Sequence, residues 1–197
     1  MKDFAAWLIR VISGIRLLPR AALPASPAIY FANHSSHLDF VTIWAALPKD
    51  IRTRTRPVAG RDYWGKTKLR QRIAADFFNA VLIERQRVTV ASNPLAPMVA
   101  ALEAGDSLIV FPEGTRSPDG AIHDFKAGLH HLARARPDVP LVPIYLQNLN
   151  RILPKGDFLP VPILGSLRVG APIQLADGED KLSFLDRARE AVVQLAH

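Results

Sequence analysis

A histidine and an aspartate five residues apart form a pattern that is suited to proton transfer. His34 follows the short apolar run 28–32, and Asp39 directly precedes the apolar run 40–47. The first run holds β-branched and aromatic residues and indicates a buried strand, whereas the second indicates a helix that Asp39 can cap. The turn between them can bring the carboxylate onto the imidazole. This arrangement is typical of a general base and the carboxylate that orients it.

Other interpretations of this segment stay open at the level of sequence. Clusters of His, Ser and Asp at strand ends often form only turns and helix caps. His37 lies closer to Asp39 than His34 does, so it is a rival for the base. The two histidines, together with Asp39 and His123, could also hold a metal ion for phosphate hydrolysis. A chelator would then abolish activity.

A second polar segment, 111–117, carries groups that are suited to binding phosphate. It reads Phe-Pro-Glu-Gly-Thr-Arg-Ser and follows another apolar run. Pro112 and Gly114 predict a tight turn, and a glycine there allows the main chain to approach a ligand closely. The Thr115 hydroxyl and the planar guanidinium of Arg116 match the geometry of phosphate oxygens.

Two further cations occupy comparable places in the sequence. Arg85 follows the apolar run 80–83, and Lys126 begins a predicted helix whose N-terminus favours anions. Each cation alone is typical of an ordinary salt bridge, so the prediction rests on their joint occurrence after successive strands. Together with His34, these groups predict a phosphate-binding cluster beside a histidine base.

The elements that position these groups alternate along the chain. The predicted strands are 28–32, 55–59, 80–83, 107–111, 141–146 and 167–169, and the predicted helices are 2–18, 40–47, 66–78, 94–104, 126–136 and 181–196. Such alternation predicts an α/β fold, a single domain with a mostly parallel central sheet flanked by helices and an amphipathic helix at the N-terminus. Ligands of such sheets bind at the carboxyl ends of the strands. We also expect an ordered surface loop at 154–162.

The N-terminal helix and one basic segment are candidates for membrane contact. We assign residues 1–20 to an amphipathic helix at the membrane interface and 21–197 to the catalytic domain, although a helix packed on a core shows the same pattern. Its apolar run is far shorter than the ~20 residues that span a bilayer. The net charge of the chain is +7, and the segment 49–72 holds nine Lys and Arg against two Asp.

The basic segment predicts a partner that carries negative charge, such as an anionic membrane, a nucleic acid, or an acidic substrate or carrier. A non-catalytic basic module that binds membrane or nucleic acid is therefore an alternative to an enzyme. No nucleic-acid-binding motif is recognised, and Tyr63 and Trp64 alone make a poor stacking platform. We accordingly expect no nucleic-acid partner.

Four segments resemble, in order and spacing, the motifs of the glycerolipid acyltransferases. Residues 33–39 resemble the first motif, a His and an Asp separated by four residues, and 111–117 match the third. Residues 81–85 and 139–143 resemble the second and the fourth. Glu84 stands where an Asp is usual. The sequence is most similar to the 1-acylglycerol-3-phosphate acyltransferases, which make phosphatidic acid.

The resemblance implies an O-acyltransferase that uses a lysophospholipid acceptor and an acyl thioester, either acyl-CoA or an acyl carrier protein, as co-substrate. His34 would be the general base and Asp39 its orienter. The residues that would bind or shape the acceptor site are Arg85, Glu113, Gly114, Thr115, Arg116 and Lys126. No cofactor or metal is implied, and the expected location is peripheral, at the cytoplasmic face of the inner cell membrane. Another lysolipid acceptor stays an alternative.

The chemistry of the residues agrees with direct transfer to the acceptor. A thioester is already activated, so a base, correct positioning and charge stabilisation are sufficient. The sequence contains no Cys and no Gly-X-Ser-X-Gly, which disfavours a covalent acyl-enzyme.

Overall fold

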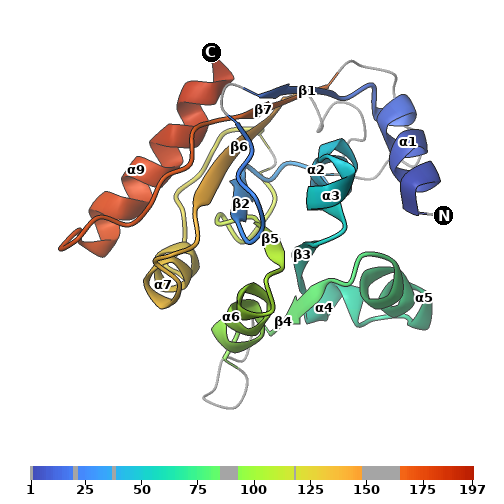
Figure 1. Ribbon diagram of the computed structural model, residues 1–197, viewed down its shortest axis with the longest axis horizontal. Coiled ribbons are helices and arrows are strands. Elements are labelled where there is room, and N and C mark those ends of the chain that lie inside the picture. The colour runs from blue at the N-terminus through green and yellow to red at the C-terminus, as the bar shows by residue number, and fades with distance from the viewer. Residues whose placement is uncertain (1, 20–21, 37–38, 85–92, 118, 148–164) are drawn as a thin grey trace.

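The computed structural model describes residues 2–19, 22–36, 39–84, 93–117, 119–147 and 165–197 (Figure 1). Within these residues the core element is a seven-stranded sheet with the order β1-β7-β6-β2-β5-β3-β4. Its strands are β1 (Arg16–Pro19), β2 (Ile29–Ala32), β3 (Thr55–Gly60), β4 (Val81–Ile83), β5 (Ser107–Val110), β6 (Leu141–Gln147) and β7 (Ser166–Val169). The strands from β6 to β4 in this order run parallel, whereas β7 is antiparallel to β6 and parallel to β1.

Helices cover both faces of the sheet. The α-helices are α1 (Lys2–Ser13), α2 (Asp39–Ala46), α3 (Lys49–Arg52), α4 (Arg61–Trp64), α5 (Lys68–Arg72), α6 (Leu95–Glu103), α7 (Gly128–Ala135) and α9 (Lys181–Val193). Figure 1 shows α1 and α2 on one side of the sheet and α6, α7 and α9 on the other. The α/β fold with a mostly parallel sheet is therefore confirmed.

The central strand β2 explains how one short apolar run supports two cores. Because side chains alternate along a strand, Tyr30 and Ala32 join the core under α1 and α2. Ile29 and Phe31 join the core under α6, α7 and α9. All four side chains are fully buried. A strand buried on both faces is expected to be continuously apolar, as this run is.

The predicted N-terminal helix over 2–18 was wrong over its last five residues, 14–18. Helix α1 ends at Ser13, because Gly14 adopts a φ of 56°, a left-handed conformation that favours glycine and ends helices. The chain then forms strand β1, which pairs with β7 at the edge of the sheet. Among the described residues, no helix combines the length and the apolar character needed to cross a membrane.

Two other regions differ from prediction. The helix expected over 66–78 is split into α5 and the π-helix η1 (Ile73–Phe77), and the short helices α3 and α4 were not predicted. The closing helix 181–196 is α9 followed by the 3₁₀-helix η2 (Gln194–Ala196). The loop expected at 154–162 lies outside the described residues.

Candidate active site

His34 and Asp39 meet at the carboxyl end of β2. The His34 Nδ1 atom lies 2.8 Å from Asp39 Oδ2. Asp39 is the first residue of α2, so the turn between strand and helix brings the carboxylate back onto the ring. A carboxylate only accepts hydrogen bonds, so Nδ1 is the donor and Nε2 keeps its lone pair.

The Asp39 carboxylate is held rigidly as well. Its side chain is fully buried, whereas the His34 side chain is 22% exposed. The same Oδ2 atom accepts hydrogen bonds from the backbone N–H groups of Ser35 at 2.7 Å and Ser36 at 2.8 Å. Three donors therefore converge on one oxygen. They compensate for its burial and fix the orientation of the imidazole.

The main chain of His34 is tied to the segment 111–117 on both sides. Its N–H donates to Glu113 Oε1 at 2.8 Å, and its C=O accepts from the Ser117 N–H at 2.7 Å. The ring itself stacks on Phe111, with centroids 4.2 Å apart and an interplanar angle of 20°. These contacts join the first and third motif segments into one rigid unit.

Glu113 is a buried residue that stabilises this unit through hydrogen bonds. Glu113 is 2% exposed, and its Oε2 atom accepts a hydrogen bond from the His123 N–H at 3.3 Å. Burial raises the pKa of the Glu113 carboxyl, while the hydrogen bonds from His34 and His123 oppose that shift. Glu113 is not among the residues that line the cavity described below. Its carboxylate therefore fixes the loop that carries the site.

Gly114 allows a lysine to lie across the turn. The glycine has a φ of 70°, and a Cβ atom built on it would stand 2.9 Å from Lys126 Nζ. The backbone N–H of Lys126 donates to the C=O of Pro112 at 2.9 Å, which fixes the start of this segment. Glycine is favoured here by its left-handed conformation, and a side chain in its place would displace the flexible end of Lys126.

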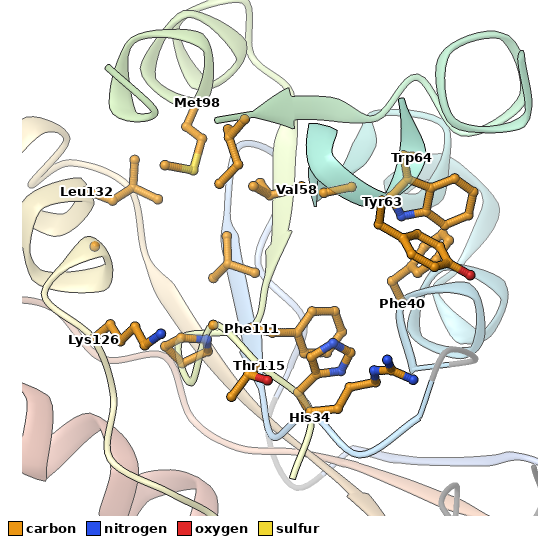
Figure 2. A pocket seen from close by; sticks show the side chains of 18 residues that line it. His34, Phe40, Val58, Tyr63, Trp64, Met98, Phe111, Thr115, Lys126 and Leu132 are labelled. Atoms are coloured by element: carbon orange, nitrogen blue, oxygen red, sulfur yellow. The ribbon is translucent and has the colours of Figure 1, made fainter. Parts of the chain in front are cut away.

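A cavity of about 420 Å³ opens beside these groups. Its polar lining includes His34, Thr115, Arg116 and Lys126. Its apolar lining comprises Val58, Ala59, Ile83, Met98, Val110, Phe111 and Leu132, and its aromatic wall comprises Phe40, Tyr63 and Trp64. Figure 2 shows His34 and Thr115 close together, with Lys126 to one side and the aromatic wall to the other.

Most of the predicted site residues therefore come together. Five of them lie in or beside one cavity, namely His34, Asp39, Thr115, Arg116 and Lys126. The buried carboxylate of Glu113 and the left-handed conformation of Gly114 fix the loop that follows β5. Arg85 and the rival base His37 lie outside the described residues. Among the residues that the structure does describe, no group of three or more His, Asp or Glu side chains is arranged to hold a metal ion.

The aromatic wall was missed by sequence reasoning. Phe40 packs against Trp64 with centroids 5.6 Å apart, and Tyr63 packs against Trp64 at the same distance. The available signal was the pair Tyr63 and Trp64, a few residues after the predicted strand 55–59, because side chains after parallel strands gather at the ligand-binding edge. The short helix α4, which presents both, had no periodic pattern to reveal it.

Comparison with known proteins identifies the family of this chain. A family model described as Acyltransferase matches residues 11–147, which include both polar segments of the site. The match covers well over half of the 197 residues. The chain belongs to the acyltransferase family. The resemblance inferred from the four motif segments is confirmed.

Curated relatives of this acyltransferase-family chain include 1-acyl-sn-glycerol-3-phosphate acyltransferase alpha of Homo sapiens, which is 32% identical over 145 residues. That alignment covers 71% of this chain and 48% of the human protein. The chloroplastic 1-acyl-sn-glycerol-3-phosphate acyltransferase LPAT1 of Arabidopsis thaliana is 31% identical over 151 residues, or 74% of this chain and 38% of that protein. The chain thus spans about half or less of the length of these relatives.

A solved structure has the same fold as this acyltransferase-family chain. The crystal structure of the 1-acyl-sn-glycerophosphate (LPA) acyltransferase PlsC from Thermotoga maritima matches it with a TM-score of 0.76 and 20% sequence identity. The match covers 99% of this chain and 77% of that chain. At this identity the likeness establishes the fold.

Proposed function

We propose that this protein is an O-acyltransferase that moves a fatty acyl group from an acyl thioester to the free hydroxyl of 1-acylglycerol-3-phosphate, giving phosphatidic acid. The observation that carries the proposal is the pair of His34 with the buried Asp39, beside a cavity that is also lined by Arg116 and Lys126. A general base and two cations in one cavity suit an acyl acceptor that bears both a hydroxyl and a phosphate.

In this mechanism His34 Nε2 takes the proton of the acceptor hydroxyl while the oxygen attacks the thioester carbonyl carbon. Asp39 stabilises the imidazolium that forms and holds its orientation. The tetrahedral intermediate then collapses, the carbon–sulfur bond breaks, and His34 returns the proton to the departing thiolate. The products are the ester and a free thiol.

Binding of the two substrates uses different parts of the cavity. Arg116 and Lys126 hold the acceptor phosphate, and Thr115 adds a hydroxyl. From the sequence motif alone, we assign Arg85 the same role. The apolar lining between Val58 and Leu132 receives an acyl chain and keeps water from the thioester.

Replacing Arg116 or Lys126 with alanine is expected to raise the KM for 1-acylglycerol-3-phosphate by about 10- to 100-fold, because a hydrogen bond to a charged group contributes ~1.5–3 kcal/mol. Steady-state kinetics should be compared with those for monoacylglycerol, which carries the same hydroxyl without phosphate. That acceptor should be used equally well by wild type and variants. Lys181→Ala, an exposed change on α9, is the control. Equal losses with both acceptors would contradict the assignment of these cations to the phosphate.

We also propose that α1 holds the protein at the cytoplasmic face of the cell membrane as a peripheral attachment. Five large apolar side chains of this helix are 40–66% exposed, namely Phe4, Trp7, Leu8, Val11 and Ile12. Such a face, next to basic residues, suits insertion among lipid headgroups at an anionic surface.

Binding to vesicles that contain anionic lipid tests this attachment. The double variant Trp7→Ser/Val11→Ser should bind them at least tenfold more weakly, since burial of each large apolar side chain contributes roughly 1.5–3 kcal/mol. Co-sedimentation measures the effect. Leu182→Ser is the matched control, because Leu182 is 66% exposed but lies on α9. Equal binding by the Trp7/Val11 variant and the control would refute the attachment through α1.

A further inference from the structure

The basic segment 49–72 divides into two parts in the structure. Four of its cations form ion pairs with Asp3 or Asp106, namely Lys49, Arg52, Arg54 and Arg56. The ion pairs among the described residues involve none of the other five, which are Arg61, Lys66, Lys68, Arg70 and Arg72. The unengaged charge of the segment is therefore concentrated around α4 and α5.

One of these cations without an ion-pair partner contacts the aromatic wall of the cavity. The guanidinium of Arg70 lies over the ring of Tyr63, 4.4 Å from its centroid, and Tyr63 lines the cavity. The helix α4 also borders a second hollow, of about 560 Å³. Arg61 and Lys66 line this hollow, together with Asp62 and Gln71.

Positive charge near the site therefore lies in two groups, only one of which lines the cavity. Arg116 and Lys126 line the cavity itself. Arg61 and Lys66 line the second hollow, and Arg70 lies over Tyr63, the residue of the cavity wall next to that hollow. Figure 2 shows His34 between Lys126 and Tyr63, the aromatic residue that Arg70 contacts. The proposed reaction brings two phosphate-bearing molecules to this base, and the acceptor phosphate accounts only for the cations that line the cavity.

We infer that Arg61, Lys66 and Arg70 bind the phosphate of the phosphopantetheine arm that carries the donor thioester. This inference rests on the proposed function and adds the site for its second substrate. Acyl-CoA and acyl carrier protein share this arm, so one site serves either source. Tyr63 and Trp64 provide an apolar surface along which the arm reaches the base, and the cations fix its charged end.

The double variant Lys66→Ala/Arg70→Ala tests the inference. Donors should include octanoyl-CoA, octanoyl carrier protein, octanoyl-4′-phosphopantetheine, and the octanoyl thioester of N-acetylcysteamine, which has no phosphate. A short-chain 1-acylglycerol-3-phosphate that stays monomeric allows the assay to run without vesicles. The variant is expected to raise the KM for the phosphate-bearing donors at least tenfold and to leave the phosphate-free thioester unchanged. Its KM for the acceptor should also be unchanged.

Arg134→Ala/Lys181→Ala removes the same charge from exposed positions on α7 and α9 and is the matched control. A loss with both CoA and carrier protein assigns the site to the shared phosphate, whereas a loss with octanoyl-CoA alone overturns that assignment in favour of the nucleotide phosphates. Unchanged KM values for all donors, with weaker vesicle binding, would show that these cations serve the membrane and would refute the inference.

Direct binding of free coenzyme A separates this inference from the proposed reaction. Isothermal titration of the wild-type protein and of both double variants requires no turnover. Weakened binding in Lys66→Ala/Arg70→Ala, but not in the control, supports the site even if the acceptor assignment fails. Equal binding by all three proteins overturns the site even if phosphatidic acid is formed.

Discussion

His34→Ala is expected to lower kcat for acyl transfer by about 10²–10⁴-fold, the range that a positioned general base contributes. The variant keeps the cavity and the cations, so the KM values for both substrates should change little. Initial rates with a labelled acyl thioester measure the effect. The loss has a direct structural reason, because His34 is the group that links a buried carboxylate to the cavity.

A matched control is His131→Ala, since His131 is exposed on α7. It should retain the wild-type rate. Thermal unfolding of His34→Ala should show a folded protein, because the Glu113 and Ser117 hydrogen bonds involve only the backbone of residue 34. A folded His34→Ala protein with a rate within a few-fold of wild type would rule out His34 as the base.

Asp39→Asn is expected to reduce kcat by a similar factor, about 10²–10⁴-fold, by a different route. The amide oxygen can still accept from Ser35 and Ser36, but it brings no charge to stabilise the imidazolium. The amide NH₂ would occupy the place of Oδ1, a buried atom that has no hydrogen-bond partner among the described residues. That unsatisfied donor should cost roughly 1–3 kcal/mol of stability.

Two measurements separate these effects. Denaturant unfolding should show the modest loss of stability, and kinetics below the unfolding midpoint should show the much larger loss of kcat. The double variant His34→Ala/Asp39→Asn should be hardly slower than His34→Ala, because Asp39 acts through the histidine. Additive losses from the two substitutions would contradict a shared role.

The sequence predicted the site because the residues suited to proton transfer and phosphate binding directly follow predicted strands. The strand 28–32 is recognisable because it is buried on both faces and therefore wholly apolar, so the polar residues after it mark its carboxyl end. The same reasoning placed 111–117 after β5. The loop between His34 and Asp39 was short enough to predict their contact.

Other features depended on tertiary contacts that one sequence does not display. Strand β1 continues an apolar pattern that also suits a helix, and only Gly14 and pairing with β7 decide between them. The four-residue spacing of Leu69, Ile73 and Phe77 suited one helix over 66–78, yet the segment is α5 followed by a π-helix. Tyr63 and Trp64 can be recognised as part of the cavity wall only from the fold, because α4 places them opposite His34 and Lys126.

Glu113 has a structural role that the sequence did not predict. Its position in the third motif segment associated it with the acceptor site. In the fold its carboxylate points inward and binds the backbone of His34 and His123. Burial is a property of the packed structure, so no local pattern could have distinguished this contribution from direct contact with a ligand.

Formation of phosphatidic acid is the measurement that tests the central claim most directly. Purified protein, a labelled acyl thioester and 1-acylglycerol-3-phosphate should be incubated with a chelator, and the lipid product and free thiol should be quantified together. The account predicts equal amounts of phosphatidic acid and thiol, undiminished by the chelator and lost in His34→Ala. Acylation of a different lysolipid alone would overturn the acceptor, and acylation of no lysolipid, or equal activity in His34→Ala, would contradict the catalytic role of the His34–Asp39 pair.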